Sequence, residues 1–570
     1  MKKELTIKIA GEAGQGTQTI GLVLCRIFKK AGLFIFANQD FMSRIRGGNN
    51  FFQLRISDKP LSALRAFSDI TVALDKASVV LHKKGLASGG LMVFDNDKFK
   101  IEDVVPSSIH VPLYDMAQKI GGAELFVNAA ACGVLTSLIR LGFYHCAEVL
   151  SAIFADKGQE VIKKNVDVAR AGYDFIKGNY KSDVFAVSEK PVKKSLLMNG
   201  NEALALGAVK AGCKFYSAYP MSPSTSIIEN ISRYAGKFNI VVEQAEDEIA
   251  AMNMIIGASF AGVRSMCGTS GGGFALMVEG LSLAGMLEVP IVAVDAQRPA
   301  PATGFPTRTE QADLDFLIHA GHGEFARVIY APGGIEEAFS LVQKAFNVAE
   351  KYQVPVLIMS DQHLADSYRN IGMLDLEKNK VKRSVLAKED SQKITDYKRY
   401  RLTPSGVSPL AVPSWNSGVI YADSDEHTEE GHITEDAETR TKMVQKRFIK
   451  KMILLSKDIE PPTAYHVKGA KTVLVGFGST LGVLKEASDV FKKERVGFIH
   501  LSQVWPFPVK QVTSLLKGKR RLYTVENNAA GQLAKLIRRE TGIKVTGSVL
   551  KYDGRPFDLD YLLDRLRKAK

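Results

Sequence analysis

Residues 213–231, CKFYSAYPMSPSTSIIENI, begin as an apolar run and change abruptly into a stretch with two prolines and four hydroxyl side chains. The run from Phe215 to Tyr219 is typical of a buried strand, because its residues are aromatic or small and carry no charge. Pro220 and Pro223 cannot donate to the hydrogen-bond ladder of a central strand, so the strand is expected to end before them. The sequence therefore predicts a hydroxyl-rich turn at the carboxyl end of a strand, which is where open α/β sheets bind ligands.

The chain on both sides of this turn alternates between strand-like and helix-like segments. Further apolar runs of strand length occur at 239–244, 264–270, 290–296, 326–332 and 355–361. This alternation is typical of a doubly wound, mostly parallel sheet with helices on both faces. We predict a domain of this class over residues 196–375.

Two more doubly wound, mostly parallel α/β domains are predicted from the same pattern, over residues 1–185 and 466–570. A polar segment at 186–195 is expected to be a linker. Residues 376–465 are charged and lack a regular apolar period. We therefore expect an extended connector there, with some helix, notably at 439–457.

Composition favours a globular chain and argues against some classes of partner. Of the 570 residues 46% are hydrophobic, yet no apolar run approaches the ~20 uncharged residues that a membrane helix needs, and no membrane contact is expected. The opening residues lack the apolar stretch of a signal peptide, so a cytoplasmic location is expected. The net charge of +14 is spread without interleaved aromatic residues, which favours acidic partners over nucleic acid.

The five cysteines lie far apart and form no CxxC pair. Neither a disulfide framework nor a metal or iron–sulfur site is therefore predicted on this chain. His427 and His432 stand five residues apart in the acidic segment 423–436. We expect them to be solvated rather than metal ligands, because this spacing in a connector is not a usual ligand pattern.

A glycine-rich loop, AGEAGQG, follows the first predicted strand and precedes a helical pattern. Its three glycines are Gly11, Gly14 and Gly16. Glycines at a helix N-terminus let the backbone approach a phosphate closely, although the G-x-x-G-x-G spacing differs from the dinucleotide fingerprint. Asp40 follows the second strand, but Arg44 and Arg46 after it fit a phosphate or partner contact better than a ribose contact. A tight turn needed only for packing is the alternative.

The segment 243–262, EQAEDEIAAMNMIIGASFAG, predicts a helix that is apolar on all sides and therefore buried. Glu248 stands at its first turn. One interpretation is a carboxylate that merely interacts with the helix dipole, as Glu246 and Asp247 beside it can also do. The other interpretation is a desolvated acid with a raised pKa, available for proton exchange.

Two more loops follow predicted strands of the same sheet, CGTSGGGF at 267–274 and VDAQRPAPATGFPTRTEQ at 294–311. The carboxyl ends of parallel strands share one edge of a sheet. These loops, the 219–225 turn and Glu248 are therefore expected in one crevice.

This predicted crevice contains groups that can bind an anionic ligand. Hydroxyl donors come from Ser222, Ser224 and Thr225. Arg298 or Arg308 can hold a carboxylate through two parallel hydrogen bonds. The alternative for each arginine is an ion pair with a nearby acid such as Asp295 or Glu310.

Four motifs in this order, YPMSPST, EDEIAAMNMIIGAS, TSGGGFALM and QRPAPATGFPTRTEQADL, resemble the pyrimidine-binding domain of the thiamine-diphosphate-dependent 2-oxoacid:ferredoxin oxidoreductases. The resemblance extends along almost the whole chain. Residues 1–185 resemble the gamma portion of these enzymes, fused ahead of an alpha portion at 196–570. Within the latter, VGFGST, QVWPFP and VENNAAGQL resemble the transketolase C-terminal-like unit.

The resemblance implies roles for individual residues. Glu248 corresponds to the glutamate that hydrogen-bonds the aminopyrimidine ring of thiamine and promotes removal of the thiazolium proton. Ser222 stands where the family has threonine, which keeps the hydroxyl and drops a methyl group. Arg298 corresponds to the residue at the substrate carboxylate, with Arg308 as the second candidate. Implied cofactor contacts are Tyr219, Pro220, Ser222, Glu248, Thr269, Ser270 and Gly271, and implied substrate contacts are Ser222, Arg298, Thr303 and Arg308.

The resemblance also implies partners. The sequence contains no GDG motif of the kind that begins a magnesium–diphosphate site. In related enzymes a separate beta subunit carries Mg²⁺, the diphosphate contacts and a [4Fe–4S] cluster. This chain is therefore expected to hold half of each active site, in a dimer of heterodimers. The loop of Gly11, Gly14 and Gly16 is the candidate site for the co-substrate CoA, and ferredoxin is the expected electron acceptor.

The implied reaction is oxidative decarboxylation of a 2-oxoacid to its acyl-CoA and CO₂, with electrons passed to ferredoxin. The gamma-then-alpha order and the 294–311 loop favour 2-oxoglutarate, with pyruvate, branched-chain 2-oxoacids and indolepyruvate as alternatives. Outside the family, the alternatives are an NAD-dependent dehydrogenase that uses the glycine loop and a scaffold subunit without a catalytic role.

Overall fold

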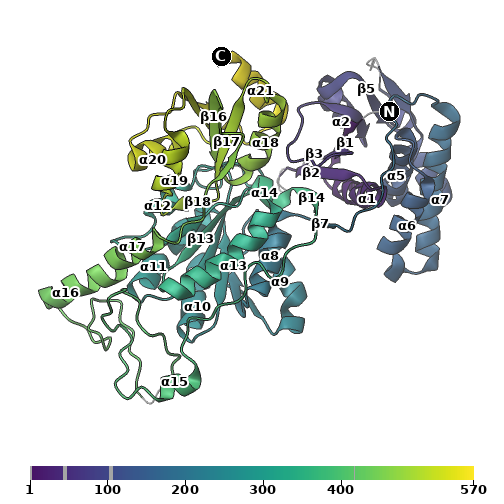
Figure 1. The fold of residues 1–570 in the computed structure, drawn as a ribbon. Coiled ribbons are helices and arrows are strands. Elements are labelled where there is room, and N and C mark those ends of the chain that lie inside the picture. The colour runs from purple at the N-terminus through teal and green to yellow at the C-terminus, as the bar shows by residue number, and fades with distance from the viewer. Residues whose placement is uncertain (1–2, 43–47, 102–106, 416–417, 570) are drawn as a thin grey trace. The chain divides into compact units, whose positions relative to one another are not determined.

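The computed structural model describes residues 3–42, 48–101, 107–415 and 418–569, and Figure 1 labels its helices and strands. Arg44 and Arg46 of the sequence analysis lie outside the described residues. The chain divides into two compact units. The first comprises Met1–Met198, Ser367–Met373 and Phe557–Lys570, and the second comprises Asn199–Asp366 and Leu374–Pro556.

The first unit is built on an eight-stranded sheet in the order β6-β5-β4-β1-β3-β2-β14-β7. The β1, β4, β5 and β6 strands pair in parallel, whereas the pairings on the β3 side of β1 are antiparallel. Six strands come from the first 110 residues: β1 (Glu4–Glu12), β2 (Phe34–Asp40), β3 (Asn49–Ser57), β4 (Ser68–Ala73), β5 (Leu86–Phe94) and β6 (Ser108–His110). This sheet therefore combines the predicted parallel part with an antiparallel half.

Two helices of the first unit, α5 (Val127–Leu138) and α7 (Gln159–Asn179), pack with their backbones in contact. A Cβ atom at Gly133 would lie 1.9 Å from the carbonyl oxygen of Ala169, and one at Gly172 would lie 2.5 Å from that of Ala130. Only glycine allows this approach. The other α-helices of residues 3–198 that the structure describes are α1 (Thr17–Lys30), α2 (Lys76–His82), α3 (Asn96–Phe99), α4 (Leu113–Met116) and α6 (Phe143–Ile153).

Among the described residues, no single helix combines enough length with enough apolar character to cross a bilayer. One sharply bent pair of helical segments, Leu113–Gly121 with Glu124–Leu138, has sufficient length and apolar composition, which is weak evidence by itself.

Strands from far along the chain complete the sheet of the first unit. β14 (Tyr368–Ile371) pairs antiparallel with β2, and β7 (Leu196–Met198) pairs with β14. The terminal helix α21 (Leu559–Lys568) also belongs here, because the guanidinium of Arg65 donates two 2.9 Å hydrogen bonds to the carboxylate of Asp560. The sequence analysis placed these segments in the second and third domains. Tertiary pairing assigns them to the first unit, because the open edge of β2 takes up the extra strands.

The second unit holds two sheets. The larger runs β18-β12-β13-β11-β10-β8-β9, and its strands pair in parallel except for β18 with β12. The smaller runs β15-β17-β16-β19-β20, with only β15 antiparallel. The predicted α/β class, with three sheets, is confirmed. The strands are β8 (Phe215–Ala218), β9 (Val241–Gln244), β10 (Ser265–Thr269), β11 (Val292–Gln297), β12 (Val328–Tyr330), β13 (Val356–Asp361), β15 (Thr463–Tyr465), β16 (Thr472–Phe477), β17 (Val496–Leu501), β18 (Gln503–Trp505), β19 (Arg521–Glu526) and β20 (Gly547–Leu550).

One apolar core joins these two sheets. Phe477 and Ile499 of the smaller sheet cluster with Leu281 and Leu357 of the larger sheet's domain, all fully buried. The regions predicted as separate domains at 196–375 and 466–570 therefore pack as one unit. Its helices are α8 (Gly200–Lys210), α9 (Thr225–Phe238), α10 (Glu248–Phe260), α11 (Gly271–Met286), α12 (Leu314–His319), α13 (Ile335–Tyr352), α14 (Gln362–Asp366), α18 (Leu481–Val490), α19 (Val509–Leu516) and α20 (Gln532–Thr541).

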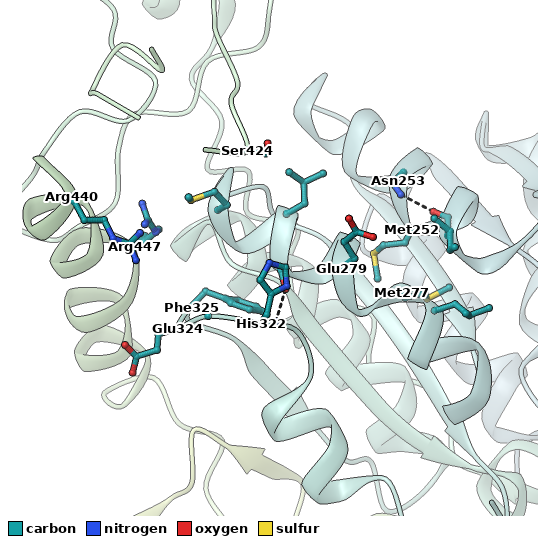
Figure 2. A pocket seen from close by; sticks show the side chains of 17 residues that line it. Met252, Asn253, Met277, Glu279, His322, Glu324, Phe325, Ser424, Arg440 and Arg447 are labelled. Atoms are coloured by element: carbon teal, nitrogen blue, oxygen red, sulfur yellow. Dashed lines mark hydrogen bonds between the residues drawn. The ribbon is translucent and has the colours of Figure 1, made fainter. Parts of the chain in front are cut away.

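Helices α10 and α11 leave part of their surface uncovered. Ile249 on α10 is 48% exposed and Leu276 on α11 is 50% exposed. Both line a groove of about 750 Å³, and Figure 2 shows Arg440 and Arg447 of the connector on its opposite side. The expectation that the helix at 248–260 is buried on all sides is therefore wrong. The apolar residues of this helix lie on two faces. One face packs into the core, and no described part of this chain covers the other.

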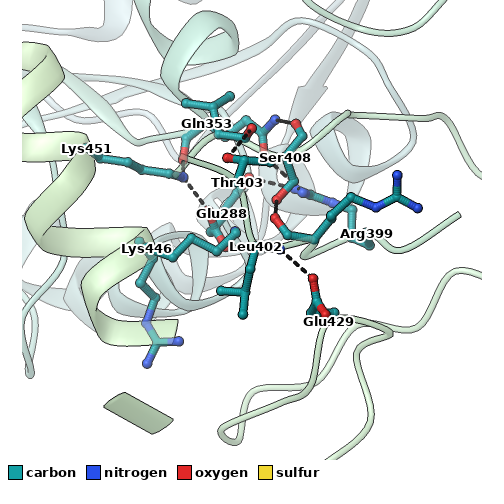
Figure 3. Close-up of polar contacts among 12 residues, drawn as sticks. Glu288, Gln353, Arg399, Leu402, Thr403, Ser408, Glu429, Lys446 and Lys451 are labelled. Atoms are coloured by element: carbon teal, nitrogen blue, oxygen red, sulfur yellow. Dashed lines mark hydrogen bonds and ion pairs between the residues drawn. The ribbon is translucent and has the colours of Figure 1, made fainter. Parts of the chain in front are cut away.

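The connector over residues 376–465 is mostly irregular and is fixed by a buried ionic cluster, shown in Figure 3. Lys446 and Lys451 form ion pairs with Glu288, which lies just after α11. Arg399 donates a 2.8 Å hydrogen bond to the carbonyl oxygen of Glu288. The connector's helical segments are α15 (Lys388–Gln392), α16 (Ala437–Val444), the π-helical turn Gln445–Lys450 and α17 (Lys451–Leu455).

In this cluster one carboxylate faces three buried cationic side chains. Burial alone would raise the pKa of Glu288, but Lys446, Lys451 and Arg399 outweigh burial and hold that pKa below its ordinary value. Burial lowers the pKa of Lys451 to about 7, against the opposing attraction of Glu288. Glu288 is therefore the group on which burial of these cations depends.

Replacing Glu288 tests this dependence. Glu288→Gln is expected to lower the free energy of unfolding by about 3–5 kcal/mol, because the buried ammonium groups lose their anion. Denaturant titration of the purified chain measures the change. Glu438→Gln, which breaks an exposed pair with Lys442 on the same helix, is the control and should have little effect. Equal effects of the two substitutions would contradict the role of the cluster.

Candidate functional site

Loops that follow β8, β10 and β11 meet at one edge of the larger sheet. The Nη1 atom of Arg298, just after β11, donates a 2.7 Å hydrogen bond to the carbonyl oxygen of Ser222 in the turn after β8. Thr269, the last residue of β10, places its hydroxyl 3.8 Å from the sulfur of Met221. The hydroxyl-rich turn, the glycine loop and the arginine loop are thus neighbours.

Glu248 faces this junction from the first turn of α10 and is only 4% exposed. Capping of the helix is done by Asp247, whose carboxylate accepts a 2.7 Å hydrogen bond from the amide of Ala250. The Oε1 atom of Glu248 is buried and has no hydrogen-bond partner among the residues that the structure describes. Because a buried polar atom without a partner costs free energy, this oxygen is suited to accept a hydrogen bond from a ligand.

The first turn of α11 lies directly against Glu248. A Cβ atom at Gly273 would lie 2.1 Å from the hydroxyl of Thr269 and 2.5 Å from Oε1 of Glu248. Ser270 precedes the helix, and its buried hydroxyl has no partner within the described part of the chain. Gly273 therefore allows α11 to begin directly against Glu248, which brings two unpartnered polar atoms and a helix N-terminus together.

The two candidate arginines have different surroundings. Burial lowers the pKa of Arg298, while the carboxylate of Glu248 opposes this shift, so the guanidinium lies within electrostatic reach of Glu248. Arg308 is buried beside the loop that contains Gly554. A Cβ atom at Gly554 would lie 3.4 Å from the Cβ atom of Arg308. The structure thus brings Arg298 into contact with the Ser222 turn.

The other predicted contacts differ in exposure. Thr269 and Ser270 are fully buried, and Gly271 begins α11. Tyr219 is 42% exposed, Pro220 is partly buried, and Ser222 and Thr303 are exposed. The exposed members belong to the turn after β8 and to the loop after Arg298.

Comparison with known proteins identifies the family. Three family models match: pyruvate ferredoxin/flavodoxin oxidoreductase at residues 6–175, its thiamine diphosphate-binding domain at 206–446, and pyruvate:ferredoxin oxidoreductase core domain II at 470–561. The alpha subunit of a 2-oxoacid:ferredoxin oxidoreductase from Sulfolobus sp is 33% identical over 98% of this chain and 96% of its own length. The chain belongs to the 2-oxoacid:ferredoxin oxidoreductases, as an alpha subunit.

Two further relatives carry more specific names. A 2-oxoglutarate synthase subunit KorA from Methanothermobacter thermautotrophicus is 29% identical over 65% of this chain and 98% of its own length. The structure of 2-oxoglutarate:ferredoxin oxidoreductase from Magnetococcus marinus, with 2-oxoglutarate, coenzyme A and succinyl-CoA bound, matches with a TM-score of 0.93 at 32% identity, covering all of both chains. The family resemblance and the enzymatic nature drawn from the sequence motifs are confirmed.

In this oxidoreductase the predicted phosphate loop of the gamma-like portion precedes α1. Gly14 and Gly16 have φ values of 97° and 76°, which glycine adopts without strain. A Cβ atom at Gly16 would lie 2.2 Å from the side-chain nitrogen of Asn128. No side chain caps α1, and its first turn contains no acidic residue.

The acidic segment of the oxidoreductase is more ordered than expected. His427 is fully buried, with its ring 4.0 Å from that of Tyr400, and its Nδ1 is hydrogen-bonded to the carbonyl of Asp425. Glu426 forms ion pairs with Arg440 and Arg447. The expectation that His427 is solvated is therefore wrong, because the connector folds back and packs the histidine against an aromatic ring.

Sequence reasoning missed one feature beside the crevice. Asp295 and Asp313 are buried close to Gly271, and Asp295 was considered only as a partner for an arginine. The apolar residues around Asp295 in the run 290–296 signal that it is buried, but only the fold shows that Asp313 lies near it.

Gly273→Ala tests the close approach of α11 to Glu248. The added methyl group would overlap Glu248 and Thr269, so oxidation of the 2-oxoacid by the assembled enzyme should fall by about 10²-fold. Gly272→Ala is the matched control, because its Cβ atom would meet only the carbonyl oxygen of Ala302 at 3.7 Å. Equal activity of the two variants would contradict the importance of this contact.

Proposed function

We propose that this alpha subunit oxidatively decarboxylates 2-oxoglutarate to succinyl-CoA and CO₂, with two electrons passed to ferredoxin through a beta subunit. The observation that carries the proposal is the unpartnered Oε1 atom of Glu248, buried in the thiamine-binding region of the chain. The choice of acid is supported by the relatives named for 2-oxoglutarate. We also propose a cytoplasmic location.

The residues around Gly273 fit the pyrimidine end of thiamine diphosphate. Such a ring needs a carboxylate acceptor for one ring nitrogen, and Glu248 offers a buried oxygen without a partner among the described residues. The hydroxyl of Ser270 is a second group at the same turn without a partner in the described part of the chain. When bound, thiamine diphosphate supplies the carbon nucleophile that attacks the 2-oxo group.

The side chains of this chain then have separate tasks. Glu248 accepts a hydrogen bond from the ring and holds the proton that must move during activation. Arg298 is the residue we assign to the substrate carboxylate, because it lies beside Ser222 and within the field of Glu248. The hydroxyl of Ser222 orients the same carboxylate. Tyr219, Pro220, Thr269 and Gly271 form the surrounding walls, while Thr303 and Arg308 are assigned to the loop that covers the substrate.

Other partners complete the active site. We place Mg²⁺, the diphosphate contacts and a [4Fe–4S] cluster on the beta subunit, in a dimer of heterodimers. The apolar residues Ile249 and Leu276, exposed on α10 and α11 next to the half-site, support contact with that subunit. CoA is assigned to the loop of Gly11, Gly14 and Gly16, because the first turn of α1 has backbone amides and no acidic side chain.

The first experiment is a substrate panel. The chain is purified with its partner subunit, supplied with thiamine diphosphate, Mg²⁺, CoA and a viologen dye, and assayed with 2-oxoglutarate, pyruvate, 2-oxoisovalerate and indolepyruvate. Fastest dye reduction with 2-oxoglutarate is the expected result. Preference for another acid would change the substrate within the family, and reduction with none would favour a scaffold role or, if NADH binds tightly, a dehydrogenase.

The same assay separates the two arginines. Arg298→Lys should raise the KM for the preferred acid by roughly 10-fold or more, because lysine cannot form the two parallel hydrogen bonds. Arg308→Lys is the matched control and should leave that KM nearly unchanged. The reverse pattern would transfer the carboxylate contact to Arg308.

Glu248→Gln tests the proton-handling role. The amide cannot take up or release a proton at the thiamine ring, so the rate of dye reduction should fall by about 10²–10⁴-fold while the subunits still assemble. Glu246→Gln, on the exposed side of the same turn, should keep full activity. An active Glu248→Gln enzyme would remove the assignment.

A further inference from the structure

Two carboxyl groups lie behind the first turn of α11. Asp295, on β11, is aligned with Thr269 on the neighbouring strand β10 and is fully buried. Asp313, just before α12, is 8% exposed. It lies directly against the helix turn, because a Cβ atom at Gly271 would be 2.5 Å from its Oδ2 atom.

These carboxyl groups have few donors within reach. Neither oxygen of Asp295, nor Oδ2 of Asp313, accepts a hydrogen bond from an N–H or hydroxyl group in the described part of the chain. The nearby amide of Gln297 is engaged elsewhere: its Oε1 accepts from the backbone N–H of Asp313, and its Nε2 donates to the carbonyl of Ser360, both at 3.0 Å. Asp295 pairs with Thr269 in the sheet and Asp313 lies against Gly271, so the two carboxyl groups are neighbours, and each acts on the pKa of the other. A hydrogen bond between two carboxyl groups requires that one of them carries a proton.

The surrounding charges favour the same state. Burial raises the pKa of Asp295 well above its ordinary value, and the neighbouring Asp313 raises it further. Burial also raises the pKa of Asp313 to about 6, and Glu310 adds to that shift. Glu310 thus adds a negative neighbour, which disfavours a second negative charge on the pair.

We propose that Asp295 and Asp313 share one proton at neutral pH and, as a positioning pair, hold the turn from Ser270 to Gly273 in place against Glu248. With one proton the two carboxyl groups attract each other through a hydrogen bond. Without it they repel, and Asp313 has no space to move away because Gly271 is packed against its Oδ2 atom. The remaining single negative charge lies near the N-terminus of α11, where the helix dipole stabilises it.

The shared proton can be observed on the purified full-length chain. Infrared difference spectra at about pH 8, wild type minus Asp295→Asn and wild type minus Asp313→Asn, are each expected to contain the carbonyl stretch of one protonated carboxyl group. Asp366→Asn is the matched control, because burial raises the pKa of Asp366 only to about 6 and leaves it ionised at that pH. Absence of the band from both pair spectra would overturn the proposal.

The pH dependence of stability gives a second measurement. A carboxyl group whose pKa is raised by folding binds more protons in the folded than in the unfolded chain, so the free energy of unfolding falls as pH rises through that window. Asp313→Asn keeps the hydrogen bond, since its amide donates to Asp295. In this variant the free energy of unfolding should fall less steeply with pH, by a slope that corresponds to at most one bound proton. An unchanged slope would overturn the proposal even if Asp313→Ala failed to fold.

The positioning role is measured on the enzyme with its partner subunit, and this part rests on the proposed function. Asp313→Ala should raise the concentration of thiamine diphosphate needed for half-maximal activity by roughly 10-fold or more, with Asp313→Asn restoring it to near the wild-type value. An equal loss in both variants would contradict the role of the pair. If the wild-type enzyme did not respond to thiamine diphosphate at all, the proposed function would fail while the infrared result stood.

Discussion

The close approach of α11 to Glu248 is the constraint on which the functional region depends. The helix begins so near the carboxylate and the hydroxyl of Thr269 that Gly273 has no room for a side chain. This approach leaves a carboxylate oxygen and the hydroxyl of Ser270 buried without partners, a cost that a folded chain bears where a ligand will satisfy them. The loop of Arg298 lies at the same place, because the guanidinium of Arg298 donates a hydrogen bond to the carbonyl oxygen of Ser222.

Buried charge is used in two different ways in the second unit. In the cluster of Glu288, Lys446 and Lys451, opposite charges fasten the irregular connector to the end of α11. At Asp295 and Asp313, two carboxyl groups are buried together beside the first turn of the same helix. Both ends of α11 thus contact ionisable groups whose burial costs free energy unless they are paired. This restricts the helix to one position.

Much of the larger sheet could be predicted from the sequence, because mostly apolar runs such as 290–296 are typical of buried strands. Glu248, Ser222, Thr269 and Arg298 could be placed at one edge, because each follows or borders the carboxyl end of a parallel strand. The sequence favoured Arg298 at the substrate carboxylate, with Arg308 as the second candidate, and that choice stays a prediction. The surroundings of the two arginines could not be predicted, because both lie in one loop and only its folded path places Arg308 against the loop at Gly554.

The sequence by itself determined the alternating α/β pattern, the buried strands and the identity of the four loop motifs, since these depend on local composition and on short-range turn chemistry. The tertiary structure alone decided that β7, β14 and α21 join the first unit, that His427 is buried against Tyr400, and that Asp313 meets Asp295. These features join residues separated by up to several hundred positions. Pairing of that kind depends on which open edge or cavity remains when the rest of the chain has folded, and no local pattern records it.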